Sequence, residues 1–273
     1  MSIQLNFIKI MKRILVSSLC VLGLIACQPK SEPVSVTLVQ YNVGVFDKYE
    51  GSGFEAVANA VNELGADVIS LNEVDSCTTR TGSVDQIAKF AEVMGEWNTL
   101  FAPALDSYKG GKYGVGVVSK PEMEVLKTET LKLPKLDGRE DRALAVVEYK
   151  DFVMCSTHLD LTLQSQLGQI EAINHYVDSV YAESGKPVFC AGDFNNFPGS
   201  EPIVLMEQTW TLLTPAEFTF PSHAPDRCID YIFVKPNGKK VTVDYTAIPQ
   251  TLQTADLATA SDHLPVVLKV TIE

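Results

Sequence analysis

A chain of 273 residues with 46% hydrophobic residues can bury a large core, which excludes a disordered or fibrous protein. Its 34 acidic and 22 basic residues give a formal charge of -12. This charge disfavours tight nonspecific binding to nucleic acid, because such binding depends on basic groups that displace counterions from phosphates. The most basic stretch, residues 109–142, is interpreted as a solvated loop surface.

The first 27 residues have the order of a bacterial lipoprotein signal peptide. Lys12-Arg13 precede an apolar run over 14–26 that is too short to span a bilayer comfortably. The run ends in Leu-Ile-Ala-Cys27, which resembles a lipobox, in which the cysteine is diacylated and becomes the mature N-terminus. The alternative is a buried N-terminal helix. We predict a signal peptide over 1–27 with Cys27 as the lipid anchor, followed by a tether over 28–33.

This prediction implies an exported lipoprotein, anchored at the periplasmic face of a membrane or at the cell surface. Removal of the segment before the cysteine takes away three cations and no acids, so the charge of the mature chain becomes -15.

Residues 34–273 carry strand and helix patterns with no linker or repeat, which predicts one domain. Alternating or short apolar runs predict strands at 34–43, 67–71, 97–103, 113–119, 123–133, 143–149, 152–157, 187–191, 229–234, 241–246 and 264–272. Helical spacing predicts helices at 54–64, 84–93, 161–181 and 201–208. Because many strands follow one another without a helix, we expect an α/β fold with two packed mixed or antiparallel sheets flanked by helices.

Polar side chains gather at the ends or edges of these predicted strands. They are Asn42, Glu73, His158, Asp193, Asn195, Asp230, Asp262 and His263. An ordinary core avoids ionisable groups so close to strand interiors, since an unpaired buried charge is costly. The chain has only four histidines, and two of them fall in this set. The concentration therefore indicates chemistry, and we expect a metal at its centre.

The segment Gly192-Asp-Phe-Asn195 follows an apolar strand. The glycine allows a sharp turn, after which Asp193 and Asn195, two residues apart, point to the same side. An aspartate can orient or deprotonate a water, and an asparagine amide can donate to a phosphoryl oxygen without adding negative charge. The alternative is an Asx turn, since Pro198 and Gly199 follow.

The segment Ser261-Asp-His-Leu-Pro265 places an acid beside an imidazole before the last strand. Neighbours on an extended chain point oppositely, so one of Asp262 and His263 can bind metal while the other faces substrate. His158 can supply a second imidazole, and Asp230 is a natural carboxylate partner that holds one imidazole in its tautomer. A lone histidine at a strand end is more often structural. A functional site is favoured because two histidines and several acidic or amide side chains occur together at strand ends.

Asn42, Glu73 and Asp262 form an oxygen-rich set that suits Mg²⁺ or Mn²⁺ rather than a thiolate zinc site. The cysteines of the mature domain, Cys77, Cys155, Cys190 and Cys228, match no zinc spacing, and we expect free thiols, although an exported protein could pair them. Asp75, His175 and His223 are expected on the surface or on a helix, and His223 is the one of these most suited to touch substrate.

The order of the motifs resembles the endonuclease/exonuclease/phosphatase superfamily from about residue 34 to the C-terminus. The motifs are Tyr41-Asn-Val-Gly44, Leu71-Asn-Glu-Val74, Tyr113-Gly-Val-Gly-Val-Val-Ser119, Ser156-Thr-His-Leu159, Gly192-Asp-Phe-Asn195, Ile229-Asp-Tyr-Ile232 and Ser261-Asp-His-Leu-Pro265. Members include pancreatic deoxyribonuclease, apurinic endonucleases, neutral sphingomyelinases and inositol polyphosphate 5-phosphatases. The resemblance implies a four-layered α/β sandwich and Mg²⁺-dependent hydrolysis of phosphoesters.

The resemblance also implies roles for single residues. Glu73 would be the principal metal ligand, supported by Asn42 and Asp262, while Asp193 and Asn195 would orient the nucleophile and the phosphate. His158 and His263 would stabilise the pentacoordinate phosphorus, with Asp230 paired to His263. Arg142 is similar to a phosphate-contacting arginine of the deoxyribonuclease branch. Where that branch pairs the first catalytic imidazole with a glutamate, this chain has Lys109-Gly-Gly-Lys112, so the partner of His158 is left unassigned.

We therefore expect an exported, Mg²⁺- or Mn²⁺-dependent phosphoesterase that uses in-line attack by water. Two alternatives are a nuclease acting on DNA or RNA, and a lipoprotein of the same fold that binds a phosphorylated ligand without hydrolysing it. The partner would be a phosphorylated small molecule, a lipid headgroup or a nucleic acid, besides the membrane that holds the lipid anchor. The sequence does not choose among these substrates, nor between one metal ion and two.

Overall fold

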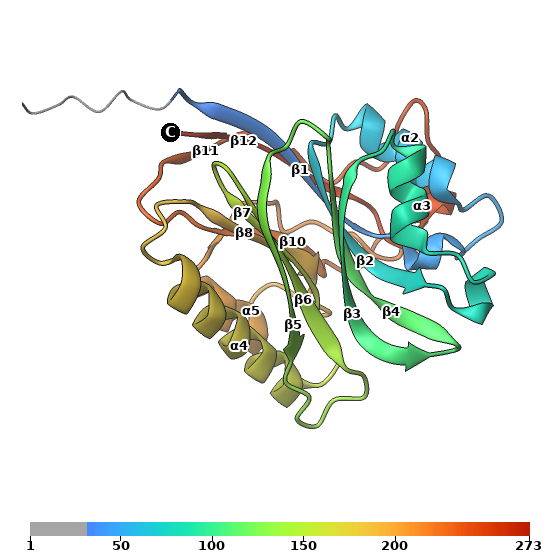
Figure 1. The fold of residues 1–273 in the computed structure, drawn as a ribbon, viewed down its shortest axis with the longest axis horizontal. Helices are drawn as coiled ribbons and strands as arrows, with labels where there is room; N and C mark the ends of the chain where they lie inside the picture. Colours follow the sequence, from blue (N-terminus) through green and yellow to red (C-terminus); the bar gives the residue numbers. More distant parts are fainter. Residues whose placement is uncertain (1–31) are drawn as a thin grey trace, which may run out of the picture. The chain divides into compact units, whose positions relative to one another are not determined.

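Two six-stranded sheets form the centre of the fold (Figure 1). The computed structural model describes residues 32–273, so the predicted signal peptide, Cys27 and most of the predicted tether lie outside the described residues. Within that part, residues 33–273 cluster into one compact unit. No helix among the described residues is both long and apolar enough to cross a membrane.

Each sheet is antiparallel except for one parallel pair near its middle. The first sheet has the order β11 (Val241–Ala247), β12 (Val266–Ile272), β1 (Val34–Asn42), β2 (Val68–Ser76), β4 (Gly111–Ser119) and β3 (Asn98–Tyr108). The second has the order β5 (Val125–Leu133), β6 (Arg142–Tyr149), β7 (Val153–His158), β8 (Val188–Asp193), β10 (Asp230–Lys235) and β9 (Thr211–Leu212). The parallel pairs are β1 with β2 and β7 with β8.

A parallel pair needs a crossover connection, and a helix supplies it in both sheets. The helices are α2 (Phe54–Glu63) between β1 and β2, α3 (Gln86–Val93), α4 (Leu163–Tyr181) between β7 and β8, α5 (Glu201–Glu207) and the short α6 (Leu257–Ala260). Two 3₁₀ turns, η1 (Gly44–Phe46) and η2 (Thr79–Thr81), complete the elements. Figure 1 shows α2 and α3 on one side of the two sheets and α4 and α5 on the other.

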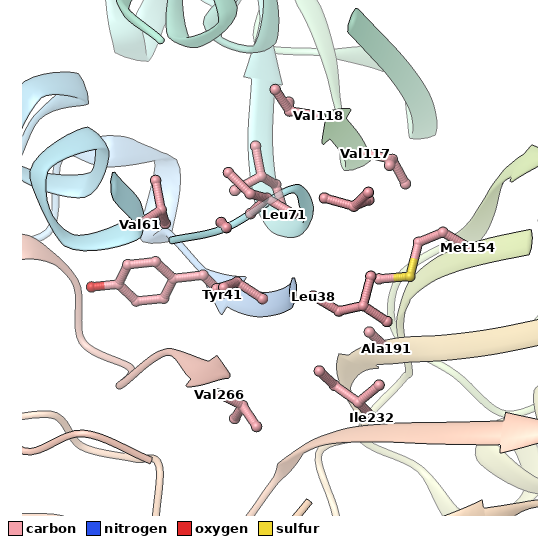
Figure 2. Close-up of a cluster of buried hydrophobic side chains, with 14 of the residues drawn as sticks. Leu38, Tyr41, Val61, Leu71, Val117, Val118, Met154, Ala191, Ile232 and Val266 are labelled. Carbon is pink, nitrogen blue, oxygen red and sulfur yellow. The ribbon is translucent and has the colours of Figure 1, made fainter. Parts of the chain in front are cut away.

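The main core lies between the two sheets. Leu38 of β1 points toward Met154 of β7 and Ala191 of β8 in Figure 2, and all three are fully buried. A second core packs the outer face of the second sheet against α4, through Ile170 and Ile173. The middle strands of each sheet thus bury both faces, one against the other sheet and one against helices, which explains why they are mostly apolar, whereas the edge strands β5 and β11 are largely exposed. The predicted four-layered sandwich is confirmed.

The predicted strands and helices all form, with ends that differ by a few residues. The largest differences are in β2, which was expected to stop at Leu71 but continues to Ser76, and in β3, which was expected to stop at Pro103 but continues to Tyr108. Glu73 therefore lies inside a strand, at an irregularity in the pairing of β2 with β4. Its φ of +56° is in the left-handed region, which costs a non-glycine residue roughly 1–2 kcal/mol. The surrounding sheet holds this residue in a conformation that a regular strand would not give it.

Candidate active site

The predicted site residues meet at one end of the sandwich. In both parallel pairs a polar side chain stands at or near the carboxyl end: Asn42 and Glu73 in the first sheet, His158 and Asp193 in the second. Antiparallel pairing places Asp230, the first residue of β10, directly opposite Asp193. Such ends of parallel strands are where α/β folds collect ligand-binding groups.

Asp193 lies at the centre of the cluster. Its Oδ2 accepts a hydrogen bond from Asn42 Nδ2 at 3.1 Å and lies 3.5 Å from Nε2 of His158 and 3.7 Å from Nε2 of His263. Burial, reinforced by the negative charge of Asp230, raises the pKa of Asp193 to about 7. A carboxylate with such a pKa can gain and lose a proton near neutral pH, as a general base must.

His263 is held as a cation by Asp230. Its Nδ1 contacts Asp230 Oδ2 at 2.8 Å, and both side chains are buried. Burial by itself lowers the pKa of His263, but the charge and hydrogen bond of Asp230 outweigh it and raise the pKa to about 9. Thr219 and Gln40 donate to the same carboxylate at 2.6 and 3.3 Å, which fixes its orientation. His263 therefore presents a protonated Nε2 to the site at neutral pH.

His158 has the opposite charge state. Burial, together with the positive charge of Arg142, moves the pKa of His158 well below its usual range. Its Nε2 is 2.9 Å from Asn195 Nδ2, which can only donate, so this nitrogen accepts and Nδ1 carries the proton. The partners of His158, unassigned from sequence, are thus Asn195 and Asp193. The two histidines, expected to act alike, differ in charge because a carboxylate, that of Asp230, is hydrogen-bonded to His263 at 2.8 Å, whereas His158 has only the longer contact of 3.5 Å with Asp193.

A network of hydrogen bonds between the two sheets holds the backbone next to the site, and it was not predicted. Asn72 Nδ2 donates to the backbone oxygen of Thr157 at 2.9 Å, while its Oδ1 accepts from the backbone nitrogen of Asp193 at 2.8 Å and from Gln40 Nε2 at 2.7 Å. The hydroxyl of Ser70 donates to the hydroxyl of Ser156 at 2.7 Å, and this hydrogen bond links the first sheet to the second. The only sequence signal was a set of polar residues at positions where strand alternation points inward.

Glu73 and Asp262 share one cation of the protein itself. Nζ of Lys48 is 3.3 Å from Oε2 of Glu73 and 3.0 Å from Oδ2 of Asp262. Burial lowers the pKa of Lys48, but the two carboxylates raise it more, so the pKa lies above its usual value. Asn42 Nδ2 donates to Oε1 of Glu73 at 3.3 Å and thereby orients it. Lys48 was missed because it lies in an irregular loop whose path the sequence does not specify.

The chemistry of these groups suits a hard divalent cation. Glu73 and Asp262 are partly exposed carboxylates that already converge on a positive charge, and oxygen-only sites are typical of Mg²⁺ and Mn²⁺. Asp193, Asp230 and His263 also offer ligand atoms within 4.8 Å of one another. Asp230 is, however, already engaged by His263, Thr219 and Gln40, so Glu73 and Asp262 are the better candidates.

Arg142 lies at the edge of the cluster with its side chain buried. One guanidinium nitrogen, Nη1, is 3.2 Å from Glu140, and the buried Nε has no hydrogen-bond partner within residues 32–273. A buried donor without a partner is costly and is expected to gain one from a ligand. Its predicted contact with phosphate therefore stays a prediction that this geometry permits.

Asp75 corrects an expectation, since it is fully buried and not on the surface. Arg80 contacts both of its oxygens, at 2.7 and 2.8 Å, and the same guanidinium lies over the rings of Tyr108 and Tyr113 at 4.9 and 5.3 Å. The extension of β2 past Glu73 explains the error, because it carries Asp75 into the fold.

Both other expected surface histidines are exposed: His175 on α4 and His223 on a loop. The ring of His223 makes an edge contact with Tyr49, next to Lys48, at 6.5 Å between centroids. Contact of His223 with substrate stays a prediction.

Comparison with known proteins agrees with this geometry. The model of the Endonuclease/Exonuclease/phosphatase family matches residues 39–263. A search of curated proteins found no match. Among solved structures, an endonuclease/exonuclease/phosphatase from Bacteroides vulgatus is 19% identical with a TM-score of 0.72, covering 88% of this chain and 100% of its own. A mannosyl-6-phosphatase from Bacteroides thetaiotaomicron is 16% identical with a TM-score of 0.70, covering 87% and 99%. ANGEL2, a 2',3'-cyclic phosphatase, is 14% identical with a TM-score of 0.65, covering 88% and 96%.

Proposed function

The chain belongs to the endonuclease/exonuclease/phosphatase family, and we propose that it hydrolyses a phosphomonoester or phosphodiester by in-line attack of water, with Mg²⁺ or Mn²⁺ as cofactor. The observation that carries this proposal is the pair of imidazoles whose Nε2 atoms both lie near Oδ2 of Asp193, at 3.5 Å for His158 and 3.7 Å for His263. One is neutral and one is protonated, and the carboxylate between them has a pKa near neutrality. This arrangement serves proton transfer and anion stabilisation together.

Each group has a step that its charge state suits. Asp193 orients the attacking water and accepts its proton as the oxygen bonds to phosphorus. The protonated Nε2 of His263 donates to a phosphoryl oxygen, where negative charge grows in the transition state. Arg142, whose buried Nε is left without a partner among the described residues, would donate to a further phosphoryl oxygen. Asn195 would do the same by giving up one of its two hydrogen bonds, to His158 or to the backbone oxygen of Leu159. The bond between phosphorus and the leaving oxygen then breaks, the leaving oxygen takes a proton from solvent water to depart as the alcohol, and Asp193 returns its proton to solvent.

Glu73 and Asp262 would hold the divalent cation, with Asn42 in support. When bound, the cation would polarise the phosphoryl group and offset its negative charge. Asn42 donates to both Glu73 and Asp193, so it links the carboxylate expected to bind the cation to the one expected to bind water. This link supports a shared site for cation and nucleophile.

A small phosphorylated compound is the substrate class that we favour. A formal charge of -12 disfavours the kind of basic surface with which a nuclease holds a polymer. Of the phosphatases that it resembles, the one from Bacteroides thetaiotaomicron is named for a phosphorylated sugar and ANGEL2 for a cyclic phosphate. We further propose export and lipid anchoring at Cys27, on the sequence order alone. The runners-up are a nuclease and a phospho-ligand-binding lipoprotein without turnover.

The test uses the mature protein from residue 28 with a sugar phosphate, a 2',3'-cyclic nucleotide, bis(p-nitrophenyl) phosphate and duplex DNA as substrates. We expect hydrolysis with Mg²⁺ or Mn²⁺, none in EDTA, and none from Glu73→Ala or His263→Ala. Equal rates with and without EDTA would refute cation dependence. Tight binding of a phosphorylated compound with no turnover under either cation would favour the binding protein, and a preference for DNA would favour the nuclease.

A further inference from the structure

We propose that Lys48 is a built-in competitor for the cation site: its ammonium group holds Glu73 and Asp262 together when no divalent cation is bound, and it must leave before a divalent cation can bind both. Lys48 thereby sets the affinity of the site for its cofactor. This inference rests on the proposed function, because it assumes that these two carboxylates receive the cation.

The distances make the two occupancies exclusive. Nζ of Lys48 lies 3.3 Å from Glu73 and 3.0 Å from Asp262, so it stands between the two carboxylates. A Mg²⁺ ion binds carboxylate oxygens at roughly 2.0–2.1 Å. An ion bound to the two oxygens that Nζ contacts would lie close to the ammonium group, and the two positive charges would repel each other. The ammonium and the divalent cation therefore compete for the same two oxygens.

The loop after β1 is shaped to deliver this side chain. Gly44 has a φ of +50°, and a Cβ atom there would lie 2.2 Å from Cγ of Lys48 and 2.5 Å from its Cε. Only a glycine leaves this path open. Val45 and Phe46 also have positive φ, at 53° and 54°, which bends the chain back toward the site. The backbone conformation thus carries a local cost that directs Lys48 to the carboxylates.

The base of Lys48 is anchored while its tip can move. Phe46 is buried, and its ring lies 4.6 Å from that of Phe54 and 5.3 Å from that of Phe90, which fixes the loop on the helical layer. The side chain of Lys48 itself is 31% exposed, so its four-carbon stem can swing into solvent without disturbing the core. Exchange of one cation for another therefore requires a change of side-chain rotamer only.

The expected effect on the affinity for the divalent cation follows from the fraction of molecules in which Lys48 is ion-paired. If the ion-paired conformer dominates, the apparent dissociation constant of the divalent cation rises by the inverse of the fraction of molecules in which the carboxylates are free. Two partly exposed ion pairs of ordinary strength would make this factor about three to ten. Removal of the ammonium group should restore the intrinsic affinity.

Isothermal titration calorimetry with Mn²⁺ and with Mg²⁺ on the mature chain tests this without any turnover. Lys48→Met keeps the aliphatic stem, and we expect it to bind either ion about three- to tenfold more tightly than the native protein. Lys120→Met is the matched control, because Lys120 forms an ion pair of similar exposure with Asp67, at 2.7 Å and away from the site. It should leave the affinity unchanged. Lys48→Gln gives a second variant and should agree with Lys48→Met.

The outcomes separate the inference from the proposed function. Equal or weaker binding by both Lys48 variants overturns the inference, even if hydrolysis depends on the cation. A gain shared by Lys120→Met also overturns it, since a general charge effect would then explain the change. If neither the native protein nor the variants bind Mn²⁺ or Mg²⁺, the inference is wrong, and metal-independent hydrolysis would then also refute the proposed cofactor.

Discussion

Substitution of Asp230 by asparagine should discharge His263 without changing the shape of the site. Asp230 is fully buried, and its Oδ2 accepts from His263 at 2.8 Å and from Thr219 at 2.6 Å. Asparagine can keep a similar set of contacts but carries no charge. Burial, which lowers the pKa of His263, would then be opposed only by the charges of Asp193 and Asp262, so the pKa should fall from about 9 to near or below its usual value.

The magnitude follows from the loss of one charged donor to the transition state. Removal of a single such donor costs about 10²–10³ in kcat, or about 3–4 kcal/mol. We expect Asp230→Asn to lose about this much activity at pH 7 on bis(p-nitrophenyl) phosphate with saturating Mn²⁺. Thr219→Val, which removes a hydrogen bond from the same carboxylate but leaves its charge, should lose no more than about tenfold.

The pH profile gives the sign of the effect. The raised pKa keeps His263 protonated below about pH 9, so the activity of the native enzyme should fall as pH rises through about 9. Activity should also fall as pH drops through about 7, because the carboxylate of Asp193 then becomes protonated and can no longer act as a base. In Asp230→Asn the alkaline fall should begin at a lower pH than in the native enzyme. A variant that folds, as judged by circular dichroism, and retains activity within threefold of native at pH 7 would refute the role of a charged His263.

Three further predictions concern other parts of the molecule. Gly192→Ala should lower the free energy of unfolding by about 1–3 kcal/mol in urea titrations, because its Cβ would lie 2.1 Å from the backbone oxygen of Thr157 on the neighbouring strand. Gly168→Ala is the control. It lies on α4 against a flexible side chain and should change the free energy of unfolding little or not at all. In the native mature protein Ellman's reagent should react quickly with Cys77 alone and with four thiols after unfolding, since burial raises the pKa of the other three cysteines. Arg142→Met should lower kcat/KM about 10- to 100-fold, and an unchanged value would exclude contact with phosphate.

Strand periodicity was sufficient to predict the layers of this fold, because side chains that alternate along a strand must be buried on one face or on both. It also located the site, since Asn42, His158 and Asp193 interrupt apolar runs at strand ends. Register was not accessible in the same way. The irregularity of β2 that turns Glu73 toward the site depends on pairing with β4, which no local pattern specifies.

The charge states of the two site histidines could not be predicted from the sequence either. His158 and His263 each follow an aspartate or precede one within a few residues, so their local contexts give no reason for opposite protonation. The difference arises because Asp230, distant in sequence, contacts only one of them. Lys48 was missed for a related reason: its contacts with Glu73 and Asp262 depend on the path of a loop rather than on a repeating pattern.

The charges around the site favour a substrate that brings its own negative charge together with a cofactor that offsets it. The cluster and its edge hold five carboxylates and three cations: Glu73, Glu140, Asp193, Asp230 and Asp262, with Lys48, Arg142 and His263. Exchange of the Lys48 ammonium for a divalent cation would reduce the excess of negative charge from two to one. A phosphomonoester then adds up to two negative charges near neutral pH, and the displaced ammonium is tethered close enough to offset part of them. Lys48 can thus weaken the binding of the cofactor and yet favour the binding of an anionic substrate once the cofactor is in place. The Lys48→Met variant should accordingly bind the divalent cation more tightly than the native protein. Its KM should rise more for a phosphomonoester than for a singly charged diester.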